Sequence, residues 1–129
     1  MTSELPKNEE PILRVVTRPN DANPTGDIFG GWLMSQIDIA GSIAAAVRAK
    51  GAVVTVAVQQ LQFIKPIYVQ DLVSFYAKVI AVGKTSLTVE IHAFAHRLCQ
   101  GEATVVKVSD ATLVYVAVAK PGEKRLVPK

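Results

Sequence analysis

One segment limits the possible folds more than any other part of the sequence. Residues 29–48 have the pattern of a long helix that is apolar on almost every side. Apolar residues recur at helical steps of three and four on two neighbouring faces: Leu33, Ile37, Ala40, Ala44 and Val47, then Ile39, Ile43 and Ala46. A helix with so little polar surface is buried on several sides. One sheet cannot cover all of it, so we expect a homodimer at minimum.

The chain after this helix has the pattern of β-structure. Four segments are rich in Val, Ile, Thr and aromatic residues, and turn-forming residues separate them. The segments are 53–64, 72–82, 85–95 and 103–118, with turns at 65–66, 83–84 and 100–101. Because no helix intervenes, neighbouring strands are expected to be antiparallel. The predicted fold class is α+β, with one long central helix wrapped by an antiparallel sheet of about five strands.

The predicted domain covers residues 12–119 and starts with a short strand at 12–18. A flexible arm, residues 1–11, precedes it, and a loose tail, residues 120–129, follows. Asp27 is expected to cap the start of the helix, and Lys50-Gly51 is expected to end it.

The composition suits one soluble, cytoplasmic domain. The chain has 129 residues, half of them hydrophobic, which is enough for a core without a metal or disulfide scaffold. Asp38 interrupts the longest apolar stretch, so no run reaches the roughly 18 residues of a membrane span. The start lacks the pattern of a secretory signal, and the single cysteine, Cys99, fits a reducing compartment. The charge of +3 is scattered and aromatic residues are only 6% of the chain, which argues against a nucleic-acid partner.

Asp38 is the only charged residue between Ile28 and Val47. Removing a carboxylate from water without a partner is costly, so such a group is usually paired or functional. Small and partly polar residues surround it at helical spacing, so a ligand could approach closely: Met34, Ser35, Gly41, Ser42 and Ala45. The residues alone allow a structural hydrogen bond, or a general base or nucleophile in a partly dry pocket.

Gly30 and Gly31 stand at the expected start of the helix. Free N–H groups there can bind an anion, including the oxyanion that forms when water attacks a carbonyl group, although two glycines can also serve only close packing. Gly30 and Asp38 are eight residues apart, roughly 12 Å at the helical rise of 1.5 Å per residue. If both act on one carbonyl, one of them comes from a partner subunit.

The string NPTGDIFGGWLMSQIDIAGSIAA, residues 23–45, resembles the YciA-type acyl-CoA thioesterases, a hot-dog family that also looks like half of the tandem-domain animal acyl-CoA hydrolases. The resemblance continues through VVTVAV, FIKPI, GKTS and SDATLVYVAV and covers nearly the whole chain after the first dozen residues. It implies a helix wrapped by an antiparallel sheet, dimers that share active sites and often a trimer of dimers. It also implies hydrolysis of acyl-CoA to a carboxylic acid and coenzyme A, with no cofactor beyond the coenzyme A of substrate and product.

Residue roles follow from the same resemblance. Asp38, in MSQID, falls at the catalytic aspartate, which acts as general base or forms an anhydride. Asn23 falls at an asparagine that holds the water or the carbonyl. Gly30 occupies the oxyanion-donor position, with Gly31 as its neighbour. Apart from the resemblance, Thr55 is a candidate substrate-binding residue, which either lies close to the carboxylate or only favours its strand.

Positive charge and backbone donors are needed for the nucleotide end of coenzyme A. The candidates lie near expected strand ends: Lys65, Gly83, Lys84, Thr85 and Ser86. An ordinary solvated role is the alternative for each.

Other kinds of site fit the sequence less well. His92 and His96 would lie roughly 13 Å apart on one strand at 3.3 Å per residue, too far for one metal ion. Ser35 lacks a nucleophile-elbow pattern, and Asp110 is expected to be a structural hydrogen-bonding residue. A hot-dog dehydratase would need a histidine ahead of the helix, but no histidine precedes His92. A non-catalytic acyl-CoA-binding module remains an alternative, although it has no need of Asp38.

Overall fold

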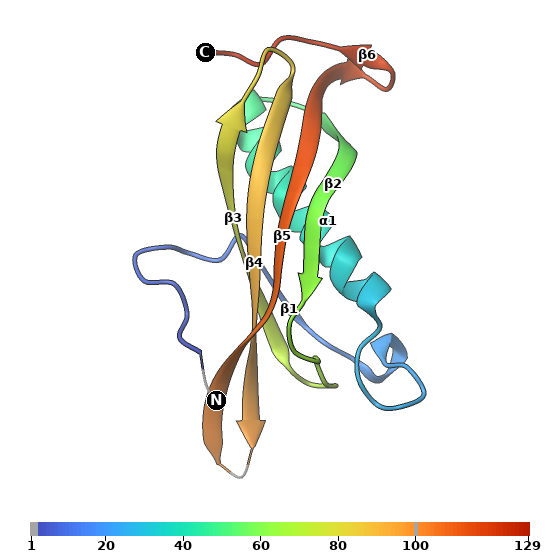
Figure 1. The fold of residues 1–129 in the computed structure, drawn as a ribbon, viewed down its shortest axis with the longest axis vertical. Helices are drawn as coiled ribbons and strands as arrows, with labels where there is room; N and C mark the ends of the chain where they lie inside the picture. Colours follow the sequence, from blue (N-terminus) through green and yellow to red (C-terminus); the bar gives the residue numbers. More distant parts are fainter. Residues whose placement is uncertain (1–2, 100) are drawn as a thin grey trace.

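One long helix lies against one face of a twisted antiparallel sheet in the computed structural model, which describes residues 3–99 and 101–129 (Figure 1). The elements are β1 (Leu13–Val16), a 3-10 turn (Pro19–Asp21), α1 (Gly30–Ala49), β2 (Val53–Phe63), β3 (Leu72–Val82), β4 (Ser86–Cys99), β5 (Glu102–Lys120) and β6 (Glu123–Lys124). The strand order is β1-β3-β4-β5-β2, with β6 beside β5, and every pairing is antiparallel. The predicted helix and the antiparallel pairing of the sheet are confirmed.

The core lies between α1 and the sheet. The buried helix residues include Leu33, Ile37, Ala40 and Ala45, and α1 contacts β2, β3, β4 and β5. On the central strand β4, alternate residues from Leu87 to Ala95 face the helix and are completely or almost completely buried, as the two-residue period of a strand requires.

The N-terminal end of the helix differs from the prediction, whereas the C-terminal end agrees with it. Phe29, not Asp27, occupies the N-cap position, and its side chain makes no capping hydrogen bond. Asp27 is wrong as a cap because its carboxylate instead accepts a hydrogen bond from the Thr25 hydroxyl. The C-terminal stop is confirmed: Lys50 has a left-handed φ of 57°, and the Gly51 N–H bonds the Ala46 carbonyl.

The expectation of a loose C-terminal tail is wrong. Residues Glu123–Lys124 pair with β5, and the N–H of Val127 donates to the carbonyl of Lys84 at 2.8 Å. The guanidinium of Arg48, in the last turn of α1, donates to the Pro128 carbonyl at 2.6 Å. Partners on β5, in the β3–β4 turn and on α1 therefore hold this segment, and its composition of Pro, Gly and charged residues did not reveal them.

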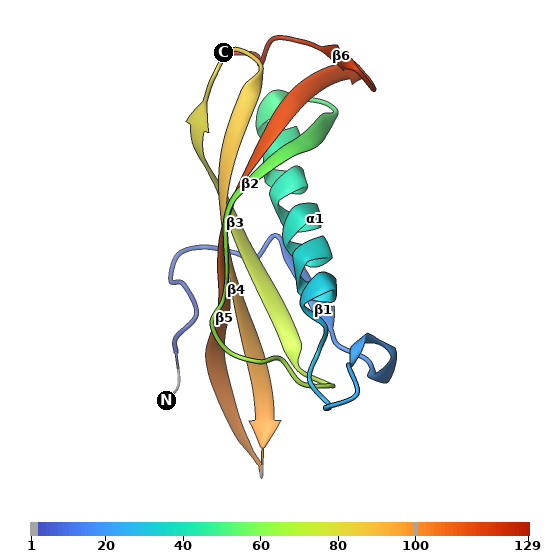
Figure 2. The same cartoon turned by 45° about the vertical axis from the view of Figure 1, so that its right-hand side comes forward.

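The first described residues cross the face of the sheet opposite α1 (Figure 2). The Ser3 N–H donates to the Val105 carbonyl at 2.5 Å, and the Ser3 hydroxyl accepts from the Lys107 N–H at 3.1 Å. The first two residues of the predicted arm and Gln100 of the predicted turn lie outside the described residues.

The hairpin of β4 and β5 is longer than expected. The prediction ended the first of these strands at Ala95, whereas pairing continues to Cys99 opposite Glu102. Polar His96 and Arg97 interrupt the apolar pattern, but hydrogen bonding between the strand backbones does not require apolar side chains. In Figure 1 this end of the hairpin extends beyond the rest of the sheet.

The sheet covers only one side of α1. Apolar residues on the outer side of the helix remain exposed, among them Met34, Ile39, Ile43 and Val47. The neighbouring strand β2 is at the sheet edge, where β5 is its one partner among the described strands, and it exposes Val54, Val56 and Val58. Among the described helices, none combines the length and hydropathy needed to cross a membrane.

Candidate active site

Asp38 lies in the middle of α1, half-buried beside the sheet. One carboxylate oxygen, Oδ1, accepts a hydrogen bond from the Thr55 hydroxyl at 2.6 Å. The Tyr115 hydroxyl lies 2.8 Å from the Asp38 main-chain carbonyl and 3.1 Å from the same Oδ1. Within the described part of the chain, no hydrogen bond reaches the other oxygen, Oδ2. The carboxylate is therefore held at one oxygen, and the second is available to a water molecule.

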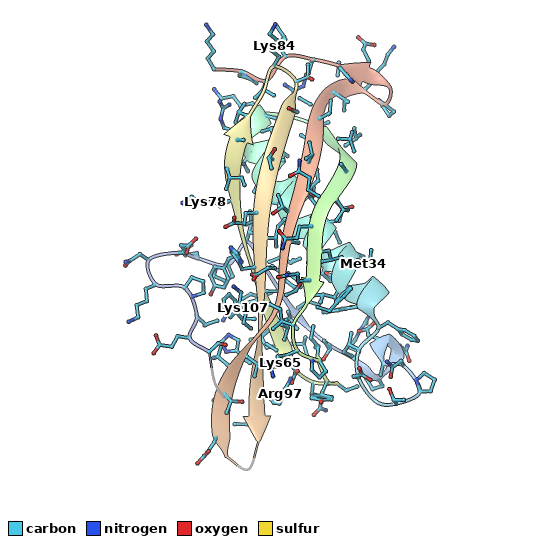
Figure 3. All side chains as sticks on the ribbon, viewed as in Figure 1. Met34, Lys65, Lys78, Lys84, Arg97 and Lys107 are labelled. Atoms are coloured by element: carbon cyan, nitrogen blue, oxygen red, sulfur yellow. The ribbon has the colours of Figure 1, made fainter. Side chains whose placement is uncertain are left out.

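Asp38 and Thr55 line a cavity of about 250 Å³. The other walls are mainly apolar: Met34, Ile37, Val58, Leu61 and Leu113, with Ser35. Met34, labelled in Figure 3, projects from α1 beside β2. An apolar cavity with one polar pair suits the reacting end of a molecule that carries a hydrocarbon chain.

A second cavity, of about 410 Å³, lies at the N-terminal end of α1. Asn23, Asp27, Gly30, Phe63 and Lys65 are among the residues that line it. As in most helices, the first N–H groups have no intrahelical acceptor, and no other acceptor for those of Gly30 and Gly31 is found in residues 3–99 and 101–129. These N–H groups can bind a negatively charged or polarised oxygen.

The two glycines differ in their surroundings. A Cβ on Gly30 would lie 3.3 Å from the Phe63 ring, whereas a Cβ on Gly31 would meet nothing within 4 Å. Close packing therefore accounts for Gly30 in part, but it does not account for Gly31.

The loop before the helix is organised by its own side chains. The Asn23 side-chain oxygen accepts from the Thr25 N–H at 2.9 Å, and the Thr25 hydroxyl lies 2.7 Å from a carboxylate oxygen of Asp27. Hydrogen bonds from Thr25 and Asn23 lower the pKa of Asp27. The loop places Asn23 and a charged Asp27 at the same cavity as the Gly30 N–H.

Within one chain, the predicted site residues around Asp38 and around Gly30 form two separate groups. Asp38 and Thr55 line one cavity, and Asn23 and Gly30 line the other. This division agrees with the roughly 12 Å between residues eight positions apart on one helix.

The predicted coenzyme A-binding residues are also divided. Lys65 lines the cavity at the start of α1, whereas Lys84 lies near the opposite end of the molecule (Figure 3). Gly83, Lys84, Thr85 and Ser86 form the β3–β4 turn, closed by a bond from the Gly83 N–H to the Ser86 carbonyl at 2.8 Å. Gly83 and Lys84 line a surface hollow with Arg48 and the tail. Within one chain, Lys65 and the β3–β4 turn therefore do not form a single phosphate-binding site.

One histidine and two carboxylates on β4 and β5 form a different kind of cluster. His92 bonds Asp110 through Nδ1 and Glu90 through Nε2, the latter at 2.8 Å. Burial acts to raise the pKa of Asp110, but bonds from Lys107 and His92 outweigh it and lower the pKa. This confirms Asp110 as a structural hydrogen-bonding residue. Among the described residues no group of three or more His, Cys, Asp or Glu could hold a metal ion; the Cys99 side chain lies outside them.

The sequence interpretation missed Tyr115 beside Asp38, and it assigned Asp27 as a helix cap, not as a residue of the Gly30 cavity. Tyr115 shares the alternating inward face of β5 with Leu113 and Ala117, which predicts burial but not contact with Asp38. That contact depends on how α1 lies across the sheet, which no local pattern contains.

Known proteins with similar sequences and structures include several thioesterases. The sequence model of the thioesterase superfamily matches residues 25–97. The acyl-CoA thioester hydrolase YciA of Salmonella typhimurium is 41% identical over 120 residues, which cover 92% of this chain and 90% of that protein. A hexameric hotdog fold thioesterase of Campylobacter jejuni is 42% identical, with a TM-score of 0.89 and coverage of 92% of this chain and 90% of that one.

A further similar structure is a hexameric broad specificity acyl-coenzyme A thioesterase, solved as a mutant with an aspartate replaced by alanine. It is 38% identical, with a TM-score of 0.89, and the match covers 95% of this chain and 88% of that one. The helix and its sheet form a hot-dog fold, as the sequence resemblance implied.

Proposed function

Because the chain belongs to the YciA family of acyl-CoA thioester hydrolases, within the thioesterase superfamily, we propose that it hydrolyses acyl-CoA to a carboxylic acid and coenzyme A. The observation that carries this proposal is the state of Asp38. Its Oδ1 is held by Thr55 and Tyr115, while Oδ2 is left available at an apolar cavity. A carboxylate fixed in this way is oriented to accept a proton from water.

The proposed reaction needs two further groups. As the water oxygen attacks the thioester carbonyl, Asp38 takes a proton and the carbonyl oxygen becomes an oxyanion, which the Gly30 N–H stabilises. Collapse of this intermediate breaks the C–S bond, and the departing thiolate takes a proton from Asp38. Asn23 holds the water or the carbonyl. A direct attack by Asp38, giving an anhydride that water then cleaves, uses the same groups.

We propose that these groups meet across a subunit boundary. In one chain Gly30 and Asp38 line different cavities, so Gly30 and Asn23 of one subunit act with Asp38 and Thr55 of another. The unpaired edge of β2 and the exposed side of α1 form the surface for this pairing. Two similar structures are hexameric, which supports a homo-oligomer assembled as a trimer of dimers.

Substrate recognition follows from the same arrangement. The apolar cavity beside Asp38 receives the start of the acyl chain. Lys65, at the Gly30 cavity, and the turn containing Lys84 supply positive charge for the phosphates of coenzyme A, each from whichever subunit reaches them.

The proposal is tested by release of free thiol from a panel of acyl-CoAs by wild type and Asp38→Ala. We expect turnover to fall by at least about two orders of magnitude, as for loss of a positioned base. Asp110→Asn, which also removes a carboxylate but on β5 beside His92, is expected to retain turnover. Near-normal turnover by Asp38→Ala would refute the assigned role.

Mixed assemblies test the shared site. Asp38→Ala subunits are combined with Gly30→Pro subunits, each inactive alone. In a mixed dimer, one site has both defects and the other has neither, so one site of two regains activity. No recovery in assemblies shown to be mixed would contradict a site built from two subunits.

A further inference from the structure

We infer that Tyr115 is a positioning residue: its buried hydroxyl, which fits only because position 41 is glycine, fixes the carboxylate of Asp38 in its working orientation. The inference rests on the proposed role of Asp38 in thioester hydrolysis and adds a residue that acts through it.

The first observation is the position of Thr55 and Tyr115 in the sheet. They are directly paired across β2 and β5, so their side chains lie on the same face of the sheet. Both hydroxyls reach Oδ1 of Asp38, at 2.6 Å from Thr55 and 3.1 Å from Tyr115. The β2–β5 register is irregular immediately after Thr55, and such bulges re-aim side chains beside active sites.

The second observation is the state of the phenol. Tyr115 is completely buried, with 0% of its surface exposed. Burial, followed by the negative charge of Asp38, raises the pKa of Tyr115, so the phenol keeps its proton. Because a phenol has a single proton to donate, Tyr115 bonds either the main-chain carbonyl of Asp38 or Oδ1 at any moment. Both acceptors belong to Asp38, so either bond holds this residue against the sheet.

The third observation is Gly41, three residues after Asp38 on the same helix. A Cβ at this position would clash with the Tyr115 hydroxyl oxygen and lie 3.0 Å from two ring carbons. Glycine within a helix is less stable than alanine, and Gly41 has no left-handed φ that would require it. Space for the phenol is the reason that this structure gives for glycine here.

The two hydroxyls differ in one respect that makes Tyr115 the more permanent constraint. Thr55 lies on the exposed edge strand, whereas Tyr115 lies on β5 between two strands and beneath the helix. Tyr115 therefore keeps its position while substrate enters and leaves the cavity beside Thr55.

The test is Tyr115→Phe, which removes only the hydroxyl, compared with Tyr76→Phe. Tyr76 is also buried but packs edge-on against Phe94, with ring centroids 5.7 Å apart. We expect kcat of Tyr115→Phe to fall about ten- to a hundredfold, the size of effect that misplacement of a catalytic group produces, with KM within about twofold of wild type. Tyr76→Phe keeps the wild-type kcat. A purely structural role would lower the melting temperature and leave the kcat of the folded enzyme unchanged.

The second arm repeats Tyr115→Phe in the Asp38→Ala background. If the phenol acts through Asp38, it causes no further loss of the residual rate there, because contacting residues that act as a unit are non-additive. Two outcomes overturn the inference about Tyr115 but leave the proposed function standing. One is a further loss of kcat when Tyr115→Phe is added to Asp38→Ala. The other is a normal kcat in Tyr115→Phe while Asp38→Ala is inactive. Retained activity in Asp38→Ala overturns the proposed function instead.

If Tyr115→Phe does not fold, Gly41→Ala provides a second test. This variant keeps the Tyr115 hydroxyl but displaces the phenol, so we expect kcat to fall although the hydroxyl is still present. Normal kcat in folded Gly41→Ala would overturn the inference, since the added Cβ occupies the space of the Tyr115 hydroxyl.

Discussion

Gly30 and Gly41 lie on the same helix, and in each case the missing side chain allows a different aromatic ring to approach. Phe63 packs at Gly30, beside the cavity of the expected oxyanion donor, and Tyr115 packs at Gly41, beside the carboxylate. At Gly30, however, the proposed chemistry depends on the N–H and not on the missing Cβ. The two requirements can be separated by substitution.

We predict that Gly30→Pro lowers kcat by about 10²- to 10³-fold, the usual effect of removing one oxyanion donor. Proline is tolerated at the first helical position, and Phe29 already has the extended ψ of 138° that precedes proline readily. Gly30→Ala is the matched control, because it adds a Cβ at the same place but keeps the N–H. Steady-state thiol release is measured for both. Equal losses would show that packing against Phe63, and not the N–H, is what matters.

The segment between β2 and β3 is the element that joins the site to the rest of the sheet. It carries Lys65 to the Gly30 cavity, and its Ile67 carbonyl accepts from the Ile28 N–H at 2.8 Å. Asp71, whose side chain is only 3% exposed, pairs with Arg97 of β4 at 2.7 Å. Arg97 also donates to the Pro66 carbonyl and lies over the Tyr68 ring. One guanidinium therefore holds both ends of this segment.

Arg97→Met is expected to lower the free energy of unfolding by roughly 2 kcal/mol. The loss of a fully buried pair would cost about 3–5 kcal/mol, but water still reaches part of Arg97 and reduces the effect. Asp71→Asn combined with Arg97→Met should regain stability, since no buried charge is left unpaired. Urea denaturation measures each variant. If the Arg97→Met protein were as stable as wild type, the contacts of Arg97 would not stabilise this segment.

Two neighbouring apolar surfaces of the whole fold are exposed: the outer side of α1 and the open edge of β2. An edge strand with unpaired N–H and C=O groups readily pairs with another chain, and exposed apolar area of this kind marks an interface. The two parts of the proposed active site lie eight residues apart on α1, at Gly30 and at Asp38. Assembly is thus a condition for the proposed catalysis as well as for burial.

Val56→Lys on β2 is predicted to reduce assembly and, in proportion to the lost dimer, thiol release. A lysine there places charge at the edge that must pair. Val16→Lys on β1 is the control at the opposite edge, since Val16 is 55% exposed and Val56 is 54% exposed. Sedimentation velocity gives the assembly state of each variant. A fully active, monomeric Val56→Lys protein would contradict the shared site.

Local patterns were sufficient for the helix and the main strands, though not for β6 or the full length of β4, and for one central residue. The period of apolar residues predicted α1 and the strands, because helices and strands repeat at different intervals. Asp38 was identifiable as either paired or functional because burying a lone carboxylate in an apolar helix costs free energy, and the family resemblance then supplied its expected role. The same reasoning misplaced Asp27 as a helix cap, since a sequence does not say whether an aspartate will bond the helix N–H groups or a neighbouring hydroxyl.

The surroundings of Asp38, in contrast, come from tertiary packing. Thr55 follows it by 17 residues and Tyr115 by 77, and the β2–β5 register together with the position of α1 brings both hydroxyls to one oxygen. The tail was held for the same reason, by partners on α1 and beside β4. Sequence periodicity records which face of an element is buried, whereas contacts between distant elements depend on register and packing, and these follow from the whole chain.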